Sequence, residues 1–135
     1  MNLAELILAE PDLKREPFPT PEWPSVDGKL WVQELTAEQR VARSIFYEQA
    51  GADKEEGRAA DLGKLRQLWA YIAVMGIVDE TFARVFTDEQ ATELGKKKAA
   101  VVERAYDRIL ELSGLTKQAA EATAKNSEAP PSEPQ

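Results

Sequence analysis

Residues 86–126 read FTDEQATELGKKKAAVVERAYDRILELSGLTKQAAEATAKN, and this stretch carries the start and stop signals of three helices. The first helix begins with a capping box. The hydroxyl of Thr87 and the amide of Gln90 can pair with backbone N–H groups that the first turn of a helix leaves without partners. Gly95 is expected to end this short helix.

The second helix is expected from Lys96 to Ser113, and its residues separate into an apolar face and a charged face. Gly114 can adopt the left-handed backbone conformation that closes a helix, and Leu115 can then contact Leu110, as in a Schellman ending. The apolar face contains Ala99, Val102, Tyr106, Ile109 and Leu110, and the charged face contains Lys97, Glu103, Arg104, Asp107, Arg108 and Glu111. The pairs Arg104 with Asp107 and Arg108 with Glu111 have i,i+3 spacing, which predicts weak ion pairs on a solvated face.

The end of the chain changes character after Asn126. Thr116 can cap a last helix from Lys117 to Lys125. Residues 126–135 are then rich in Ser, Glu, Pro and Ala, which bury too little apolar surface to offset the entropy of ordering. We therefore expect a disordered C-terminal tail.

This pattern resembles the C-terminal half of the tail assembly chaperones of long-tailed bacteriophages of the siphophage type. A second patch upstream also fits that family, whereas two segments depart from it: residues 78–83 lack the glycine of an Asp-Gly turn, and residues 51–63 look like an insertion. The segments that carry the resemblance are VFTDEQ (85–90), LGKK (94–97), LSGLT (112–116), Lys125-Asn126, PEW (21–23), LWVQELT (30–36) and EQR (38–40).

The resemblance implies a function without chemistry. Such a protein binds and solubilises the tape measure protein, helps to recruit tail tube subunits, associates with itself as an oligomer or spiral, and is absent from the mature virion. It acts in the cytoplasm of the host cell, and its gene often yields a longer product by frameshifting. Two alternatives stay open, which are a structural protein of the virion at the head–tail junction and a protein-binding adaptor unrelated to phages.

The N-terminal part of the chain reads as an extended arm. Residues 4–10 form a brief helical or extended piece, and five prolines between Pro11 and Pro24 disfavour regular structure. Residues 13–18 can form an edge strand that pairs with residues 30–33, with a turn at residues 25–28 where Asp27-Gly28 supplies a positive φ. A short β-hairpin is therefore expected.

Two more helices complete a mainly α fold of four to five helices. Thr36 and Gln39 repeat the capping-box spacing and start a helix that runs to about Gln49. Another helix is expected from Leu62 to Met75, with Asp61 as its cap. The predicted organisation is an N-terminal arm with a short β element (1–35), a helical domain (36–125) and a disordered tail (126–135).

The large apolar residues divide into a predicted core and a predicted partner surface. Trp23 and Trp31 can either anchor the arm or form an interface, because aromatic side chains with a polar edge are enriched at binding hot spots. The candidate surface for partners or self-association is Phe18, Trp23, Trp31 and Val32. The candidate core is Val41, Ile45, Leu65, Leu68, Trp69, Ile72, Phe86, Val102, Tyr106, Ile109, Leu110 and Leu115.

Composition argues against several other functions. The 135 residues suit one domain, and a net charge of −7 disfavours nucleic acid as a partner. There is no histidine and no cysteine, so the residues most used for acid–base catalysis, thiolate chemistry and transition-metal binding are missing. Pairs of neighbouring acidic residues lie at loop edges and at helix starts, where the helix dipole stabilises a negative charge. We expect neither catalysis nor a cofactor or metal site, and no apolar run is long enough to cross a membrane.

Overall fold

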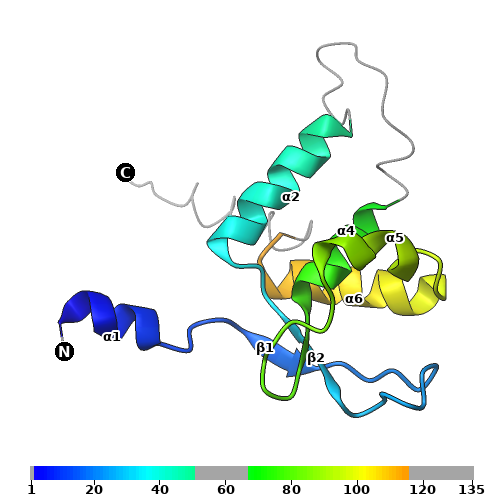
Figure 1. Ribbon diagram of the computed structural model, residues 1–135, viewed down its shortest axis with the longest axis horizontal. Helices are drawn as coiled ribbons and strands as arrows, with labels where there is room; N and C mark the ends of the chain where they lie inside the picture. The colour runs from blue at the N-terminus through cyan, green and yellow to red at the C-terminus, as the bar shows by residue number, and fades with distance from the viewer. Residues whose placement is uncertain (1, 51–66, 116–135) are drawn as a thin grey trace, which may run out of the picture.

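A computed structural model describes residues 2–50 and 67–115 of the chain. Within this part, five α-helices and one 3-10 helix accompany a small sheet, so the fold is mainly α (Figure 1). The elements are α1 (Leu3–Ala9), β1 (Arg15–Pro17), β2 (Leu30–Gln33), α2 (Ala37–Gln49), α4 (Leu68–Gly76), β3 (Ile77–Asp79), η2 (Asp88–Gln90), α5 (Ala91–Leu94) and α6 (Ala99–Leu112).

The sheet has three antiparallel strands in the order β1-β2-β3. Strand β1 lies within the segment 13–18 and pairs with β2 across the Pro-rich loop, in which Gly28 has a φ of +84°. The strand β3 was not predicted, because the sequence shows Ile77 and Val78 only as a short apolar segment after a helix. Since β3 pairs with β2, both edges of β2 are paired and β2 is the central strand.

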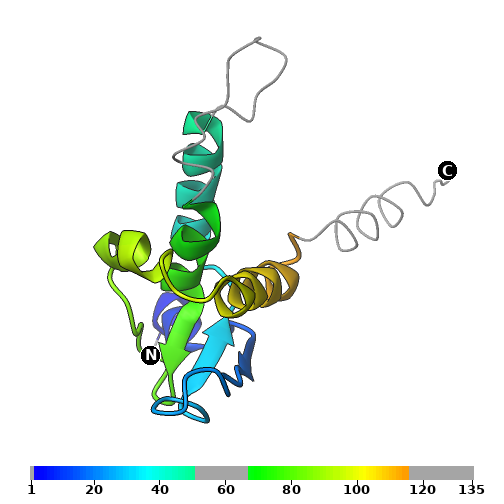
Figure 2. The same cartoon turned by 90° about the vertical axis from the view of Figure 1, so that its right-hand side faces the viewer.

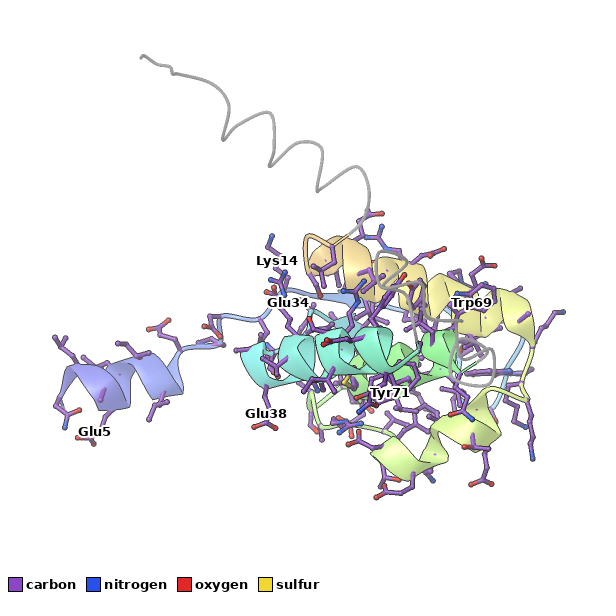
Figure 3. The ribbon with its side chains drawn as sticks, turned by 90° about the horizontal axis from the view of Figure 1, so that it is seen from above. Glu5, Lys14, Glu34, Glu38, Trp69 and Tyr71 are labelled. Carbon is purple, nitrogen blue, oxygen red and sulfur yellow. The ribbon has the colours of Figure 1, made fainter. Side chains whose placement is uncertain are left out.

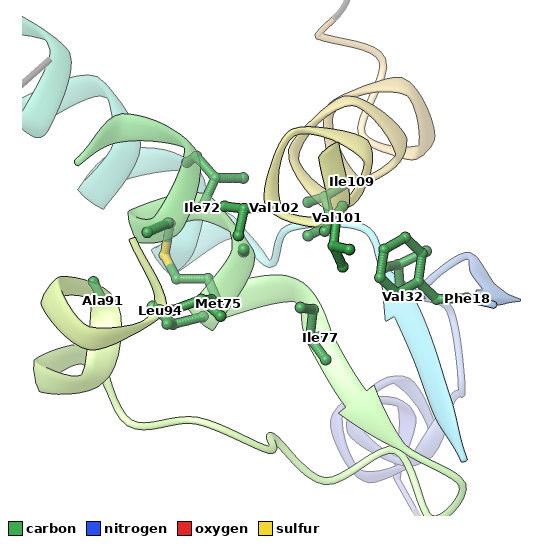
Figure 4. Close-up of a cluster of buried hydrophobic side chains, with 14 of the residues drawn as sticks. Phe18, Val32, Ile72, Met75, Ile77, Ala91, Leu94, Val101, Val102 and Ile109 are labelled. Carbon is green, nitrogen blue, oxygen red and sulfur yellow. The ribbon is translucent and has the colours of Figure 1, made fainter. Parts of the chain in front are cut away.

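One hydrophobic core lies between the sheet and helices α4 and α6 (Figure 4). Figure 2 shows α6 beside α4, with β2 and β3 running below them. Residues from the N-terminal arm and from the helices join this core together, and they include Phe18, Leu30, Val32, Leu68, Ile72, Met75, Ile77, Leu94, Val102, Ile109 and Leu110.

Helix α4 continues into β3 without a loop, so the last carbonyl groups of the helix need partners from elsewhere. Arg84 donates hydrogen bonds from Nε and Nη2 to the carbonyl of Val74, at 3.1 and 2.7 Å. The Nε2 amide of Gln39 donates to the carbonyl of Met75 at 3.2 Å. These long-range bonds stabilise the change from helix to strand and attach α2 to the body.

Several helix boundaries follow the sequence signals. The N–H of Gln39 donates to Thr36 Oγ1, and the N–H of Thr36 donates to Gln39 Oε1, so α2 has a capping box at its start. The N–H of Thr87 donates to Gln90 Oε1, although the turn that follows is a 3-10 helix before α5 begins.

Helix α6 begins at Ala99, three residues later than the predicted start at Lys96. The N–H groups of Lys96 and Lys97 still bond to the end of α5, and this turn delays the new helix. At its other end, Gly114 has a φ of +71° and the N–H of Leu115 donates to the carbonyl of Leu110 at 2.8 Å. This is the predicted Schellman ending.

Three residues predicted to lie in the core are instead exposed. Helix α2 contacts the body through the side that carries Ala42 and Phe46, and Phe46 stacks on Tyr71 with ring centroids 4.2 Å apart. Val41 and Ile45 lie beside that contact side and remain 60% and 50% exposed. Trp69, next to Leu68 on α4, is 39% exposed, and its ring contacts that of Tyr106 at the surface, with ring centroids 6.4 Å apart.

Five other residues of the predicted core are buried, namely Leu68, Ile72, Val102, Ile109 and Leu110. Phe86, Tyr106 and Leu115 are partly buried and pack against the core. The predicted position Leu65, the start of the 62–75 helix, the 51–63 segment, the 117–125 helix and the 126–135 tail lie outside the described residues.

Ser113 joins the end of α6 to the segment before α2. Its Oγ accepts the N–H of Leu35 at 2.9 Å and donates to the carbonyl of Ile109 at 2.7 Å, and all of these groups are buried. We expect Ser113→Ala to lower the free energy of unfolding by about 1–3 kcal/mol, because the N–H of Leu35 would stay buried without a partner. Urea denaturation measures this loss. The matched variant Ser44→Ala, at an exposed position of α2, should change the free energy by less than about 0.5 kcal/mol. Equal effects of the two variants would contradict the assignment.

Candidate protein-binding surfaces

An apolar pocket of about 420 Å³ opens between the Pro-rich loop and the segment around η2 and α5. We call it the Trp23 pocket. Most of its wall is apolar, and one cation, Lys97, stands at its rim. Its lining residues are Trp23, Ser25, Val26, Leu30, Val85, Phe86, Leu94 and Lys97.

A compact turn holds Trp23 against the pocket. The N–H of Trp23 donates to the carbonyl of Thr20 at 2.8 Å, and the N–H groups of Val26 and Asp27 donate to the carbonyl of Trp23 at 3.0 Å. The carboxylate of Asp27 accepts the N–H of Thr20 at 2.9 Å and closes the turn. The loop therefore presents Trp23 in one fixed position.

Two arginines of α6 attach the N-terminal arm to the helices. Arg104 donates to both carboxylate oxygens of Glu22, at 2.9 and 3.0 Å, and Arg108 donates to both oxygens of Glu16, at 2.6 and 2.7 Å. The predicted pair of Arg108 with Glu111 is present. The predicted pair of Arg104 with Asp107 was wrong, because the folded arm places Glu22 in the fork of the Arg104 guanidinium, a geometry that carboxylates match well.

The Arg104–Glu22 pair predicts a dependence of stability on pH. The hydrogen bond from Arg104 lowers the pKa of Glu22 from 4.5 to about 2. A lowered folded-state pKa stabilises the fold fully above pH 4.5, and that contribution is lost as the pH falls towards 2. The same direction holds for Glu16, whose pKa is lowered by its hydrogen bond with Arg108.

We therefore expect Glu22→Gln to unfold more easily than wild type at pH 7 and to lose less additional stability between pH 4.5 and 2. Urea denaturation at pH 7, 4.5 and 2 measures both effects. Glu103→Gln, at an exposed position of α6 next to Arg104, is the control and should follow the wild-type profile. Parallel pH profiles for Glu22→Gln and wild type would show that the pair does not stabilise the fold.

A second group of side chains, in which Phe82 is exposed and Trp31 and Arg15 are half-buried, lies on the face of the sheet away from α4 and α6. The ring of Trp31 meets that of Phe82 edge to face at 5.5 Å, and the guanidinium of Arg15 lies 4.2 Å from the centre of the Phe82 ring. We call these three residues the Trp31 face.

The turn after β3 forms even though residues 78–83 lack the glycine that the related family has in its Asp-Gly turn. Phe82 itself has a φ of +66°, which is uncommon for a large side chain. Asp79 holds the turn, since its Oδ1 accepts hydrogen bonds from Thr81 and from the N–H of Ala83. Backbone strain of this kind is often found at functional positions.

Two residues of the predicted partner surface are buried. Phe18 is 2% exposed and Val32 is fully buried, and both lie under α6 (Figure 4). They face the helices because side chains alternate along a strand, which places Val32 on the inner face and Trp31 on the outer one. Of the four predicted residues, only Trp23 and Trp31 are therefore available to a partner, and they lie at two different surfaces.

The residues that complete the two surfaces could not be found from the sequence. Phe82 joins the Trp31 face, and Val26, Val85, Leu94 and Lys97 join the Trp23 pocket, only through the fold, so no local pattern indicates them. Helix α1 is different, because its run LAELILA is visibly apolar and none of its residues is buried.

No three His, Cys, Asp or Glu side chains gather within residues 2–50 and 67–115 where they could share a metal ion. In the same ranges, no helix is both long and apolar enough to cross a bilayer.

The fold and these surfaces define a small, mainly α protein whose helices cover one face of a three-stranded sheet and whose other surfaces carry apolar groups. The same fold occurs in a solved structure, the tail assembly chaperone of bacteriophage HK97. The two structures superpose with a TM-score of 0.54 and 15% sequence identity, over 74% of this chain and 85% of that one.

The resemblance to phage tail assembly chaperones is thus confirmed at the level of the fold. No protein family matches the sequence in a scan of family descriptions. No curated protein matches it either.

Proposed function

We propose that this chain is a tail assembly chaperone of a long-tailed bacteriophage, which binds and solubilises the tape measure protein and helps to recruit tail tube subunits. The shared fold with the HK97 chaperone is the observation that carries the proposal. The sequence segments 21–40 and 85–126 also support it, because the order and spacing of their residues resemble those of the same family.

The physical basis of the activity is the temporary covering of apolar surface. A tape measure protein is a long, largely helical chain, and its exposed apolar seam is disfavoured in water. Many copies of a small domain can shield such a seam, because many weak contacts along one chain give a high overall affinity. Tube subunits can still displace the copies one at a time. Grooves beside α4 and α6 are the proposed contact for the tape measure, and the Trp31 face is the proposed contact for the tube protein.

Self-association of the chaperone, action in the host cytoplasm and absence from the mature virion belong to the same proposal. The two alternative functions, a structural virion protein and an adaptor unrelated to phages, can each be distinguished from a chaperone by one observation. A structural head–tail protein would persist in finished particles. An adaptor unrelated to phages would lack genes for tube and tape measure proteins beside its own.

Co-expression tests the proposal. A tape measure fragment that is insoluble alone should become soluble when this chain is produced with it, and the two should purify together. An unrelated insoluble protein serves as the control for general effects on solubility. If the fragment stays insoluble at equal expression, the chaperone function is wrong.

The Trp31 face can be separated from tape measure binding in the same system. Trp31→Ala and Phe82→Ala should weaken capture of the tail tube protein and leave the tape measure fragment soluble. Arg40→Ala, at an exposed position of α2 away from the sheet, is the control variant. Unchanged capture of the tube protein by both aromatic variants would remove the Trp31 face from the proposal.

A further inference from the structure

Helix α1 exposes four large apolar side chains to solvent and buries none. Leu3, Leu6, Ile7 and Leu8 are 77%, 45%, 68% and 86% exposed. The helix is nevertheless formed, with a capping box in which the N–H of Glu5 donates to Asn2 Oδ1 at 2.9 Å. An isolated helix of seven residues is too short to be stable in water by itself, so α1 needs a surface to pack against.

The spacing of these side chains fits a docking helix. Leu3, Leu6 and Ile7 lie at i, i+3 and i+4, which places them on one face, as in helices that bind to a groove. The chain around them is acidic, since residues 2–13 contain Glu5, Glu10 and Asp12 and no basic side chain.

The Trp23 pocket is complementary to α1 in both respects. Its wall is apolar, and its volume of about 420 Å³ lies within the range of roughly 300–1,000 Å³ that is usual for binding pockets. Its cationic rim residue, Lys97, lies between two further exposed lysines, Lys96 and Lys98. An acidic, apolar helix would therefore be attracted to this pocket more strongly than a basic one.

We propose that α1 of one copy of this chain docks in the Trp23 pocket of a second copy. The proposal rests on the self-association that forms part of the proposed function, and it names the contact. Figures 1 and 3 show α1 at one end of the long axis of the molecule and α5, which contributes Leu94 to the pocket, at the other.

The attachment of the arm favours a partner copy over the same copy. Lys14 is bound to Glu34 by two hydrogen bonds, at 2.7 and 2.9 Å, which directs α1 away from the end of the sheet that carries the Pro-rich loop. A contact between two different surfaces is heterologous, so each copy in a row can accept one neighbour and donate to another. The result is an open chain of copies or a ring.

Sedimentation velocity of the full chain over a range of concentrations tests this contact. Wild type should form species larger than a dimer as its concentration rises. Ile7→Glu should weaken association at least tenfold, and it should leave the fold intact because Ile7 is 68% exposed and lies outside the core. Val41→Glu is the matched control, since Val41 is similarly exposed on α2, and it should associate like wild type.

A second variant tests the pocket without disturbing the core. Ser25→Glu combined with Lys97→Glu changes only exposed residues and places negative charge at the rim, which repels the acidic arm. This double variant should also lose association. Mixed with Ile7→Glu, it should form dimers and nothing larger, because only one productive contact, an intact helix in an intact pocket, remains.

The outcomes separate this proposal from the proposed function. Loss of association in Ile7→Glu, with the tape measure fragment still soluble in co-expression, would support the contact. A wild-type chain that stays monomeric at all concentrations, or one that associates equally well as Ile7→Glu, would overturn it whatever happens to the tape measure. Loss of tape measure binding by the rim variant with normal self-association would also overturn it, and would assign the pocket to the tape measure.

Discussion

Replacing Gly76 by alanine is expected to lower the free energy of unfolding by about 1–3 kcal/mol, which is the usual cost of adding a methyl group to a packed core. Gly76 ends α4 where that helix crosses α6. A Cβ atom there would lie 2.6 Å from Cγ1 of Ile109 and closer still to its Cδ1. Ile109 is fully buried, so its side chain cannot move into solvent to make room.

Urea denaturation of Gly76→Ala and of a matched variant, Gly95→Ala, measures this effect. A Cβ atom at Gly95 would make only ordinary contacts, the nearest at 3.4 Å, so that variant should change stability by less than about 0.5 kcal/mol. Ile109→Ala alone should cost about 2–5 kcal/mol, and combined with Gly76→Ala it should cost less than the sum of the two. Strict additivity would contradict the close approach of α4 and α6.

Replacing Phe18 by alanine is expected to cost about 3–5 kcal/mol, because it removes a large side chain from the core where the arm, the sheet and α6 meet. This prediction separates a core role for Phe18 from the interface role that the sequence suggested. Urea denaturation gives the free energy of unfolding, and gel filtration reports whether the variant still associates when folded.

Phe82→Ala is the control for Phe18→Ala, since Phe82 is 40% exposed and contacts mainly Trp31 and Arg15. It should lose no more than about 1.5 kcal/mol, the contribution of an aromatic pair. If Phe18→Ala were as stable as wild type but failed to bind a partner, Phe18 would belong to an interface after all.

The sequence predicts correctly those parts of the fold that are fixed by hydrogen bonds between residues close together in the chain. The Thr36 and Thr87 capping boxes and the Gly114 ending are hydrogen-bond patterns that close within three to six residues, so residue types at fixed spacing are enough to locate them. Strand β3 was missed because its pairing partner, β2, lies more than forty residues earlier in the chain.

The direction in which a helix faces is harder to predict than its ends. Helix α2 has two neighbouring apolar faces, one with Phe46 and one with Val41 and Ile45. The packing of Phe46 on Tyr71 turns the first face to the body, so Val41 and Ile45 remain exposed to solvent. The partner of Arg104 is likewise set by a contact across 82 residues of sequence, which i,i+3 spacing cannot reveal.

The candidate surfaces show the same limit. Trp23 and Trp31 could be recognised as aromatic residues in a thinly covered arm, but the strand pleat and the Pro-rich loop place them at two separate surfaces. The neighbours that complete those surfaces, Phe86 and Leu94 in one and Phe82 in the other, come from distant segments of the chain. Residues 4–10 were predicted only as a brief helical or extended piece, and the exposure of the apolar side chains of α1 becomes apparent only in the structure.

We propose that this protein covers part of the tape measure during assembly and then leaves. Quantitative mass spectrometry of tail assembly intermediates and of finished particles from the same infection distinguishes such transient binding from incorporation. The chain is expected to accompany the tape measure protein in the intermediates, in several copies for each tape measure chain, and to be absent from finished particles. A constant number of copies in every finished particle would show that the protein is a structural component instead.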